Sequence, residues 1–325
     1  MRKWANDKEW YVGSNRQMQS LSIRSLVLLL ALAIIWGTTF LFAEIALTEV
    51  SPTTLTLHRV LWAVPVLGAI LYQKRYKIPS DLRFWFGCVV MGALNNALPF
   101  SLIFWSQTQI TSGLAAILNS TTSVFAILIA ALFLKDEPLT IKKIFGGILG
   151  VSGAVLIIGP TDLNNLDLLS IAQMAMLAAT ISYAFAGVWS RLSLSGYHPL
   201  LNAFGMLTAT TFLMTPIVIF TDGTPSFVLS VPVWASVIAI SVFCTALAYV
   251  LYFEIIKLSG ASNALLVTLL IPIFAVTAGH VFLEEVIEKI DFVGFGIIIL
   301  GFIVIDGRLT KFFTTSKFVF KLKSK

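Results

Sequence analysis

The segment SGLAAILNSTTSVFAILIAALFLKDE, residues 112–137, has a relative later in the same chain. The second copy, GASNALLVTLLIPIFAVTAGHVFLEE, occupies residues 260–285, and Phe125 aligns with Phe274 at an offset of about 148 residues. Both segments are long and apolar enough to cross a bilayer as a helix. They end differently, because the first closes with Lys-Asp-Glu and the second with Leu-Glu-Glu. The repeat predicts a chain built from two related halves.

The composition requires lipid around most of the surface. Of the 325 residues, 58% are hydrophobic and 12% are charged, and the mean hydropathy is +0.91. A soluble domain has about 25% charged residues. The net charge of +6 does not indicate nucleic-acid binding, because the basic residues lie between apolar runs and do not gather with aromatic residues on one face. Cys88 and Cys244 fall inside apolar runs, so we expect buried thiols and no metal site.

Apolar stretches of about 20 residues predict ten membrane-spanning helices. Their approximate limits are 26–46, 52–72, 84–105, 112–134, 141–159, 168–190, 199–220, 233–256, 261–283 and 291–308. The first stretch is too long for a cleavable signal and lacks a small-residue cleavage site. The links are short, which leaves no room for a separate soluble domain.

The charges of the links predict the orientation. Lysine and arginine gather in both tails and in the links after the second, fourth, sixth and eighth spans, whereas the other links carry carboxylates and a single lysine, Lys289. Basic links remain in the cytoplasm, so both termini are expected there. The predicted parts are a basic N-terminal tail 1–25, a first repeat 26–160, a second repeat 161–308 and a basic C-terminal tail 309–325.

Five spans in each half invert the second half relative to the first. Glycines follow the same offset, since Gly146 and Gly153 match Gly294 and Gly301. Inverted repeats of this kind build transporters whose substrate site lies near the midplane, between the halves. The expected fold is therefore an all-α integral membrane protein with ten transmembrane helices in two inverted five-helix repeats.

The chain also resembles the EamA family of the drug/metabolite transporter superfamily, with two EamA domains, from about residue 30 to residue 307. The resemblance rests on IIWGTTF, SPTTLTLHRV, LNNALPFSLIFWSQTQITSGLAAILNSTTSVF, SYAFAGVWSRL and TALAYVLYFEIIKLSGASNALLVTLLIPIF. It implies alternating access and, as is common in the family, export of amino acids and related metabolites across the bacterial inner membrane. Glu254 departs from relatives that often carry a basic residue there.

Two asparagines in the third span, Asn95 and Asn96, need polar partners because an unpaired amide in hydrocarbon is costly. Adjacent helical residues point about 100° apart, so the two side chains face different neighbours. They either bond to adjacent helices or line a cavity. Pro99 leaves a backbone carbonyl unpaired one turn back, which favours a gate or a ligand contact for at least one asparagine.

Aromatic residues and amides at similar depth form the wider candidate cavity. Trp36 and Tyr183 occupy matching positions in the two halves. Aromatic walls with a few amides suit an amphipathic organic solute better than an inorganic ion. The hydroxyls of residues 121–123 are expected to bond to their own helix. The candidate substrate-binding residues are Trp36, Asn95, Asn96, Phe100, Asn119, Tyr183, Tyr249, Asn263 and Thr268.

Charged and proton-linked candidates within the spans are few: Glu44, His58, Arg59, Glu254 and His280. An arginine at the depth of Arg59 needs a partner, and Glu44 lies at a compatible depth. That pair is either a structural salt bridge or a site where Arg59 receives a substrate carboxylate and Glu44 exchanges protons. Glu254 is expected to pair with a lysine three residues on, and His280 is either structural or proton-linked.

Taken together, these features predict a secondary transporter of the bacterial inner membrane that exports small organic metabolites, with amino acids or analogues first. Nucleobases, sugars and drug-like cations are alternatives. No Walker motif is present, so a proton or substrate gradient is expected to drive transport. An integral-membrane transferase is a weaker alternative, because Asp162 and Asp167 lack basic partners, and a channel or light-driven pump is weaker still. We expect no enzyme activity, cofactor or metal, and lipid and solute as partners.

Overall fold

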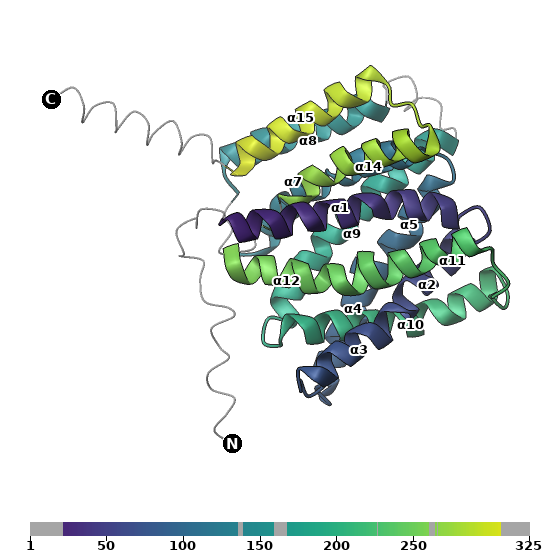
Figure 1. Ribbon diagram of the computed structural model, residues 1–325. Coiled ribbons are helices and arrows are strands. Elements are labelled where there is room, and N and C mark those ends of the chain that lie inside the picture. Colours follow the sequence, from purple (N-terminus) through teal and green to yellow (C-terminus); the bar gives the residue numbers. More distant parts are fainter. Residues whose placement is uncertain are drawn as a thin grey trace.

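The computed structural model describes residues 22–135, 139–158, 168–225, 227–259, 264 and 266–306, and every regular element in these ranges is helical. Figure 1 shows long helices lying side by side, with α3 reaching out from one corner of the bundle. The predicted tails fall mostly outside the described residues, as do Asn263, Asp162 and Asp167.

The helices follow the apolar runs closely. In the first half they are α1 Ile23–Ala46, α2 Pro52–Leu61, α3 Ala63–Gln73, α4 Leu82–Gly92, the π-helix η2 Ala93–Ala97, α5 Leu98–Gln107, α6 Ser112–Asn119, α7 Thr122–Phe133 and α8 Ile141–Ile158. In the second half they are α9 Leu168–Ser193, α10 Pro199–Thr221, α11 Val231–Ile238, the π-helix η3 Ala239–Leu247, α12 Ala248–Ser259, α14 Val267–Leu283 and α15 Lys289–Asp306.

Within the described residues, seven helical stretches are long and apolar enough to cross a membrane, and Val267–Leu283 is a shorter apolar helix. The all-helical, multi-pass architecture is therefore confirmed. The count of ten spans stays a prediction.

Several helices begin at side chains that accept backbone hydrogen bonds. Ser51 caps α2 by accepting from the amide of Thr54 at 3.2 Å, and Pro52 follows at the first helical position. Asp81 caps α4 by accepting from the amide of Phe84 at 2.8 Å. Such caps satisfy amides that have no partner inside the helix, so polar residues between the apolar runs set the helix ends.

The two ends of the bundle are distinguished here by the elements that reach them. The terminal face is the end where α1 begins at Ile23 and α15 ends at Asp306, and it lies on the left in Figure 1. The opposite face is the end where α1 stops at Ala46.

Packing repeats between the halves. Helix α1 packs on α14, and its counterpart α9 packs on α7, while α8 packs on its own counterpart α15. Glycines permit the last contact, because a Cβ on Gly301 would lie 2.6 Å from the carbonyl oxygen of Gly146, and one on Gly153 would lie 2.6 Å from that of Gly294. The glycines matched by the sequence repeat thus meet crosswise at the α8–α15 contact.

The two π-helices also occupy matching places. Shifting Ala93–Ala97 by the repeat offset of about 148 residues places it inside Ala239–Leu247. A π-helix weakens the regular backbone ladder and often marks a functional position. The irregular backbone expected beside Pro99 is therefore present as η2, and the second half contains its equivalent.

Each π-helix is bonded by the first helix of the other half. The Trp36 indole on α1 donates to the carbonyl of Cys244 in η3 at 3.2 Å. The Ser182 hydroxyl on α9 donates to the carbonyl of Leu94 in η2 at 2.6 Å. These bonds bring both irregular segments to the boundary between the halves.

Candidate functional site

A group of polar and aromatic side chains lies where the two halves meet at mid-depth. We call it the central cluster, and it consists of Trp36, Arg59, Asn95, Asn96, Phe100, Tyr183, Thr245 and Tyr249. Arg59 is eight residues from the α2 cap, which places it about 12 Å from the opposite face at 1.5 Å per residue. Six of these residues were among the predicted cavity candidates.

Arg59 is a buried cation without an anionic partner. Its Nε donates to the Thr245 hydroxyl at 3.1 Å, and its guanidinium carbon lies 3.7 Å from the centre of the Phe100 ring. Among the described residues it makes no ion pair, and only 9% of its surface is exposed. A cation–π contact of this kind compensates for only part of the lost hydration.

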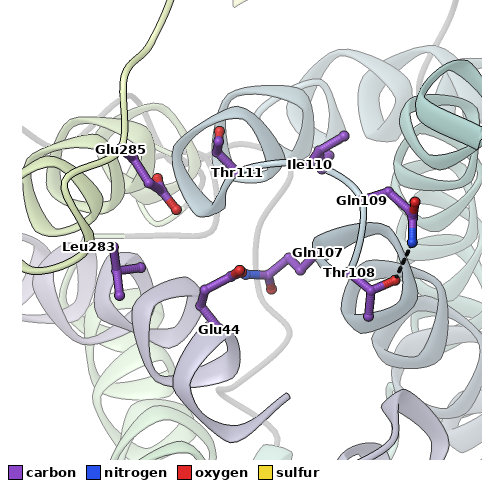
Figure 2. A pocket seen from close by; sticks show the side chains of 8 residues that line it. All are labelled: Glu44, Gln107, Thr108, Gln109, Ile110, Thr111, Leu283 and Glu285. Carbon is purple, nitrogen blue, oxygen red and sulfur yellow. Dashed lines mark hydrogen bonds between the residues drawn. The ribbon is translucent and has the colours of Figure 1, made fainter. Parts of the chain in front are cut away.

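The predicted salt bridge between Glu44 and Arg59 is wrong. The ion pair that the described residues form instead joins Arg24 to Glu254, at 3.2 Å. Glu254 therefore has an ion-pair partner on α1, 230 residues away in sequence, and its pairing within its own helix stays a prediction. Equal depth on two helices does not make side chains face each other, and Glu44 points into a different cleft (Figure 2).

The two asparagines have separate partners, as the angle between adjacent helical residues requires. Asn96 is fully buried and donates to the Thr210 hydroxyl of α10 at 3.1 Å. Asn95 is half-buried and donates to the Tyr249 hydroxyl of α12 at 3.1 Å. It also donates to Asn96 Oδ1 at 3.1 Å. The pair therefore links η2 to two helices of the second half.

Aromatic rings surround the polar groups. Trp36 lies 5.5 Å from Tyr252 between ring centres, and Phe100 lies 6.5 Å from Tyr183. Tyr249 stacks on Phe253 at 6.2 Å. The cluster thus offers a guanidinium, amides and phenol hydroxyls within aromatic walls, which suits an organic solute with an acidic group.

The other candidates lie outside the central cluster. Asn119 ends α6, and Thr268 is the second residue of α14, which are matching places in the two halves. The hydroxyls of residues 121–123 bond to their own helix carbonyls at 2.7–2.9 Å, as expected. His58 accepts from the indole of Trp62 at 3.0 Å and sits against the rings of Phe227 and Trp234.

A cleft of about 430 Å³ opens at the opposite face (Figure 2). Its lining combines carboxylates, carboxamides and hydroxyls: Glu44, Gln107, Thr108, Gln109, Ile110, Thr111, Leu283 and Glu285. Glu44 comes from the last turn of α1 and Gln107 from the last turn of α5. Two segments of the first half and the link after α14 thus enclose one polar space.

Glu285 joins the halves beside this cleft. Its carboxylate accepts from the Ser112 amide at 2.8 Å, the Ser112 hydroxyl at 2.9 Å and the Gly113 amide at 3.1 Å. Negative charge is stabilised at a helix N-terminus, so a side chain of the second half caps α6 of the first. The carbonyl oxygen of Glu285 forms a hydrogen bond with His280 Nδ1 at 3.1 Å, and the choice between a structural and a proton-linked histidine stays a prediction.

Another carboxylate closes a second contact at the opposite face. Asp222, at the end of α10, accepts hydrogen bonds from the hydroxyls of Ser51, Thr53 and Thr54 at the start of α2. Burial raises the pKa of Asp222, but these hydrogen bonds outweigh it and hold the pKa below its usual range.

The terminal face has its own contacts between the halves. Besides the pair of Arg24 and Glu254, the Tyr197 hydroxyl donates to Asp81 Oδ1 at 2.8 Å. The backbone amide of Phe84 and this tyrosine lower the pKa of Asp81. Contacts between the halves therefore exist at both ends of the bundle, with the central cluster between them.

Sequence reasoning missed four functional candidates: Thr210, Thr245, Gln107 and Glu285. The first two are single hydroxyls in apolar helices, which usually bond to their own backbone. Only the depth of Arg59 and Asn96 indicated that partners were needed. No group of three or more histidine, cysteine or carboxylate side chains in the described residues is arranged to hold a metal ion.

Comparison with known proteins identifies relatives of the whole chain. Residues 23–159 and 170–306 each match the EamA-like transporter family. An uncharacterized transporter of Archaeoglobus fulgidus is 25% identical over 261 residues, which are 79% of this chain and 89% of the relative. The uncharacterized inner membrane transporter YedA of Escherichia coli K12 is 25% identical over 298 residues, 91% and 92% of the two chains. A solved crystal structure shares the fold, with a TM-score of 0.61, 17% identity and coverage of 86% of this chain and 96% of the other.

Proposed function

Because the chain belongs to the EamA-like transporter family, we propose that it is a secondary transporter of small organic acids. Amino acids and their analogues are the favoured substrates, and they move by alternating access around the central cluster. The ten-span inverted architecture, the cytoplasmic termini and the outward direction of transport are parts of this proposal. The relative named an inner membrane transporter supports the same membrane for this chain.

The observation that carries the proposal is the lack of a counter-ion at Arg59 among the described residues. A guanidinium has five N–H donors, and the described residues accept one of them, through Thr245. Planar, paired N–H groups match the geometry of a carboxylate. A solute carboxylate at this position supplies the missing charge and pairs the remaining donors.

Tyr249 and Asn95 provide the second part of the site. They bond to each other at 3.1 Å in this structure, and both are only half-buried. Their polar groups can exchange that bond for one to the solute, since neither is enclosed as fully as Asn96. An amino acid or an analogue with polar groups beside its carboxylate fits this combination.

Alternating access is supported by the positions of the contacts that join the two halves. The Glu285–Ser112 contact acts at the opposite face, and the Arg24–Glu254 contact acts at the terminal face. Opening either face to admit solute requires its contact to break. The two π-helices lie between these contacts, and their weakened ladders are suited to absorb bending.

Uptake into everted inner-membrane vesicles tests the function. Vesicles with the protein receive a panel of labelled amino acids, each beside the corresponding amide that lacks the carboxylate. We expect protein-dependent accumulation of at least one acid and little of its amide. Arg59→Gln should abolish that accumulation, whereas Arg83→Gln, an exposed arginine on α4, should retain it.

Two results would count against this proposal. Equal accumulation of an acid and its amide would show that Arg59 does not read a carboxylate. Absence of accumulation for every acid would reject this substrate class and direct the panel to nucleobases, sugars and drug-like cations.

A further inference from the structure

The cleft at the opposite face contains two buried oxygen atoms that lack a hydrogen-bond donor among the described residues. They are Oε2 of Glu44 and Oε1 of Gln107, and both residues line the same space. Figure 2 shows the Glu44 carboxylate next to the nitrogen end of the Gln107 carboxamide. A buried acceptor without a donor loses its hydration and gains nothing in return.

The orientation of the Gln107 amide is fixed by its other neighbour. Its Nε2 donates to the carbonyl of Phe40 at 2.9 Å, and a backbone carbonyl can only accept. Flipping the amide would set two acceptors against each other. Gln107 is 2% exposed, so its carbonyl oxygen has no ready access to water.

Glu285 makes a charge on Glu44 less favourable still. Both carboxylates line the cleft, and Glu285 is already committed to three donors at the start of α6. Of the elements packed on the end of α1, helices α5, α6 and α11 carry no charged side chain. The other charged or titratable groups near this end are His280, which bonds to the Glu285 carbonyl, exposed Glu284, and Glu49, which accepts from the Ser230 amide at 2.8 Å.

The buried Glu44 Oε2 lacks a hydrogen atom. A proton on Glu44 Oε2 removes the unpaired charge from the cleft that Glu285 also lines. A metal ion would instead need several oxygen ligands around it. The Glu285 carboxylate already accepts three hydrogen bonds at the start of α6. The geometry therefore favours a proton over a metal cation.

We propose that Glu44 is a proton-binding site, loaded from the opposite face beside Gln107, and that this proton is the coupling ion of the transport cycle. The coupling role rests on the proposed transport function, whereas the protonation itself does not. A protonated Glu44 no longer repels Glu285, so proton binding stabilises the cap that joins α6 to the second half. Loss of the proton weakens that contact and favours opening between the halves.

Infrared difference spectroscopy on the purified full-length protein in lipid membranes tests the site without any solute. The pH is stepped from acid to alkaline, and the C=O stretch of protonated carboxylic acids is recorded. We expect a band that persists at neutral pH in the wild type and in Glu288→Gln, a matched carboxylate at the same face. The band should be absent in Glu44→Gln and should shift in Gln107→Leu, which removes the amide beside Glu44.

Each other outcome overturns the proposal. A neutral-pH band that survives in Glu44→Gln would place the proton elsewhere. Absence of any such band in the wild type would leave Glu44 ionised. If sodium chloride at fixed pH removes the band and choline chloride does not, the site binds a metal cation. Gln107→Leu gives an independent readout if Glu44→Gln does not fold.

Transport assays distinguish the coupling role of Glu44 from the proposed transport function. If Glu44 carries the coupling proton, Glu44→Gln vesicles should still exchange solute for solute but should lose the stimulation by a proton gradient. Full stimulation in that variant would reject the coupling role. A wild type that moves no solute rejects the proposed function, while the spectroscopic result stands by itself.

Discussion

Replacing Gly301 by alanine should separate α8 from α15. The added Cβ would lie 2.6 Å from the carbonyl oxygen of Gly146 and 2.6 Å from the amide nitrogen of Gly150, whereas ordinary contacts begin near 3.4 Å. Both atoms belong to backbone, so no side-chain rotation relieves the clash. The helices must move apart along a contact that joins the two halves.

The magnitude follows from two opposing effects. Alanine favours a helix over glycine by about 0.5–1 kcal/mol. Overpacking of a close contact costs about 1–3 kcal/mol. Gly296→Ala on the same helix should gain only the helix propensity of alanine. No described atom of a neighbouring residue lies within 4 Å of the position of its new Cβ. We therefore expect Gly301→Ala to be less stable than Gly296→Ala by about 1–3 kcal/mol.

The comparison is made by unfolding both purified variants in mild detergent, with increasing denaturing detergent or temperature, beside the wild type. Using two variants of one helix cancels the propensity difference. Equal midpoints for Gly301→Ala and Gly296→Ala would refute the close packing of α8 on α15.

Three further predictions concern polar contacts. Thr210→Val removes the acceptor of the fully buried Asn96 and should lower the free energy of unfolding by about 1–3 kcal/mol, and an unchanged thermal midpoint would contradict this. The lowered pKa of Asp222 means that its stabilisation is present above the unfolded-state pKa and is lost as pH falls through the folded-state pKa. Acid unfolding followed by circular dichroism should therefore be less pH-dependent in Asp222→Asn, and an identical profile would argue against the hydroxyl cap. Breaking the exposed pair of Arg24 and Glu254 with Arg24→Gln should cost less than about 1 kcal/mol, and a larger loss in detergent unfolding would show that the pair does more than join two surface groups.

Much of the fold follows from apolar length and from the repeat. The first span was predicted at 26–46 and the helix is Ile23–Ala46, because its apolar run is visible in the sequence. The interruptions were harder to predict. The η3 segment, AISVFCTAL, reads as an ordinary apolar helix, and only its match to η2 through the repeat offset hints at the irregularity.

The site was predicted only in part, for a geometric reason. A residue's position along a span gives its depth but not the direction in which its side chain points. Glu44 and Arg59 were matched by depth, yet Arg59 meets Thr245, 186 residues away. Trp36, Asn95 and Tyr249 were grouped by depth and residue type, because large polar-tipped residues at mid-depth need partners, and Asn95 indeed bonds to Tyr249; their role in solute binding stays a prediction.

Solute counterflow in proteoliposomes tests alternating access around the central cluster most directly. Vesicles containing the purified protein are loaded with an unlabelled acid that the uptake panel identifies, and are diluted into a trace of the labelled acid. A carrier that alternates should concentrate the label inside transiently, above the outside level, with no ion gradient, and Arg59→Gln should not. Simple equilibration of the label by the wild type, without overshoot, would indicate an open pore and contradict the account.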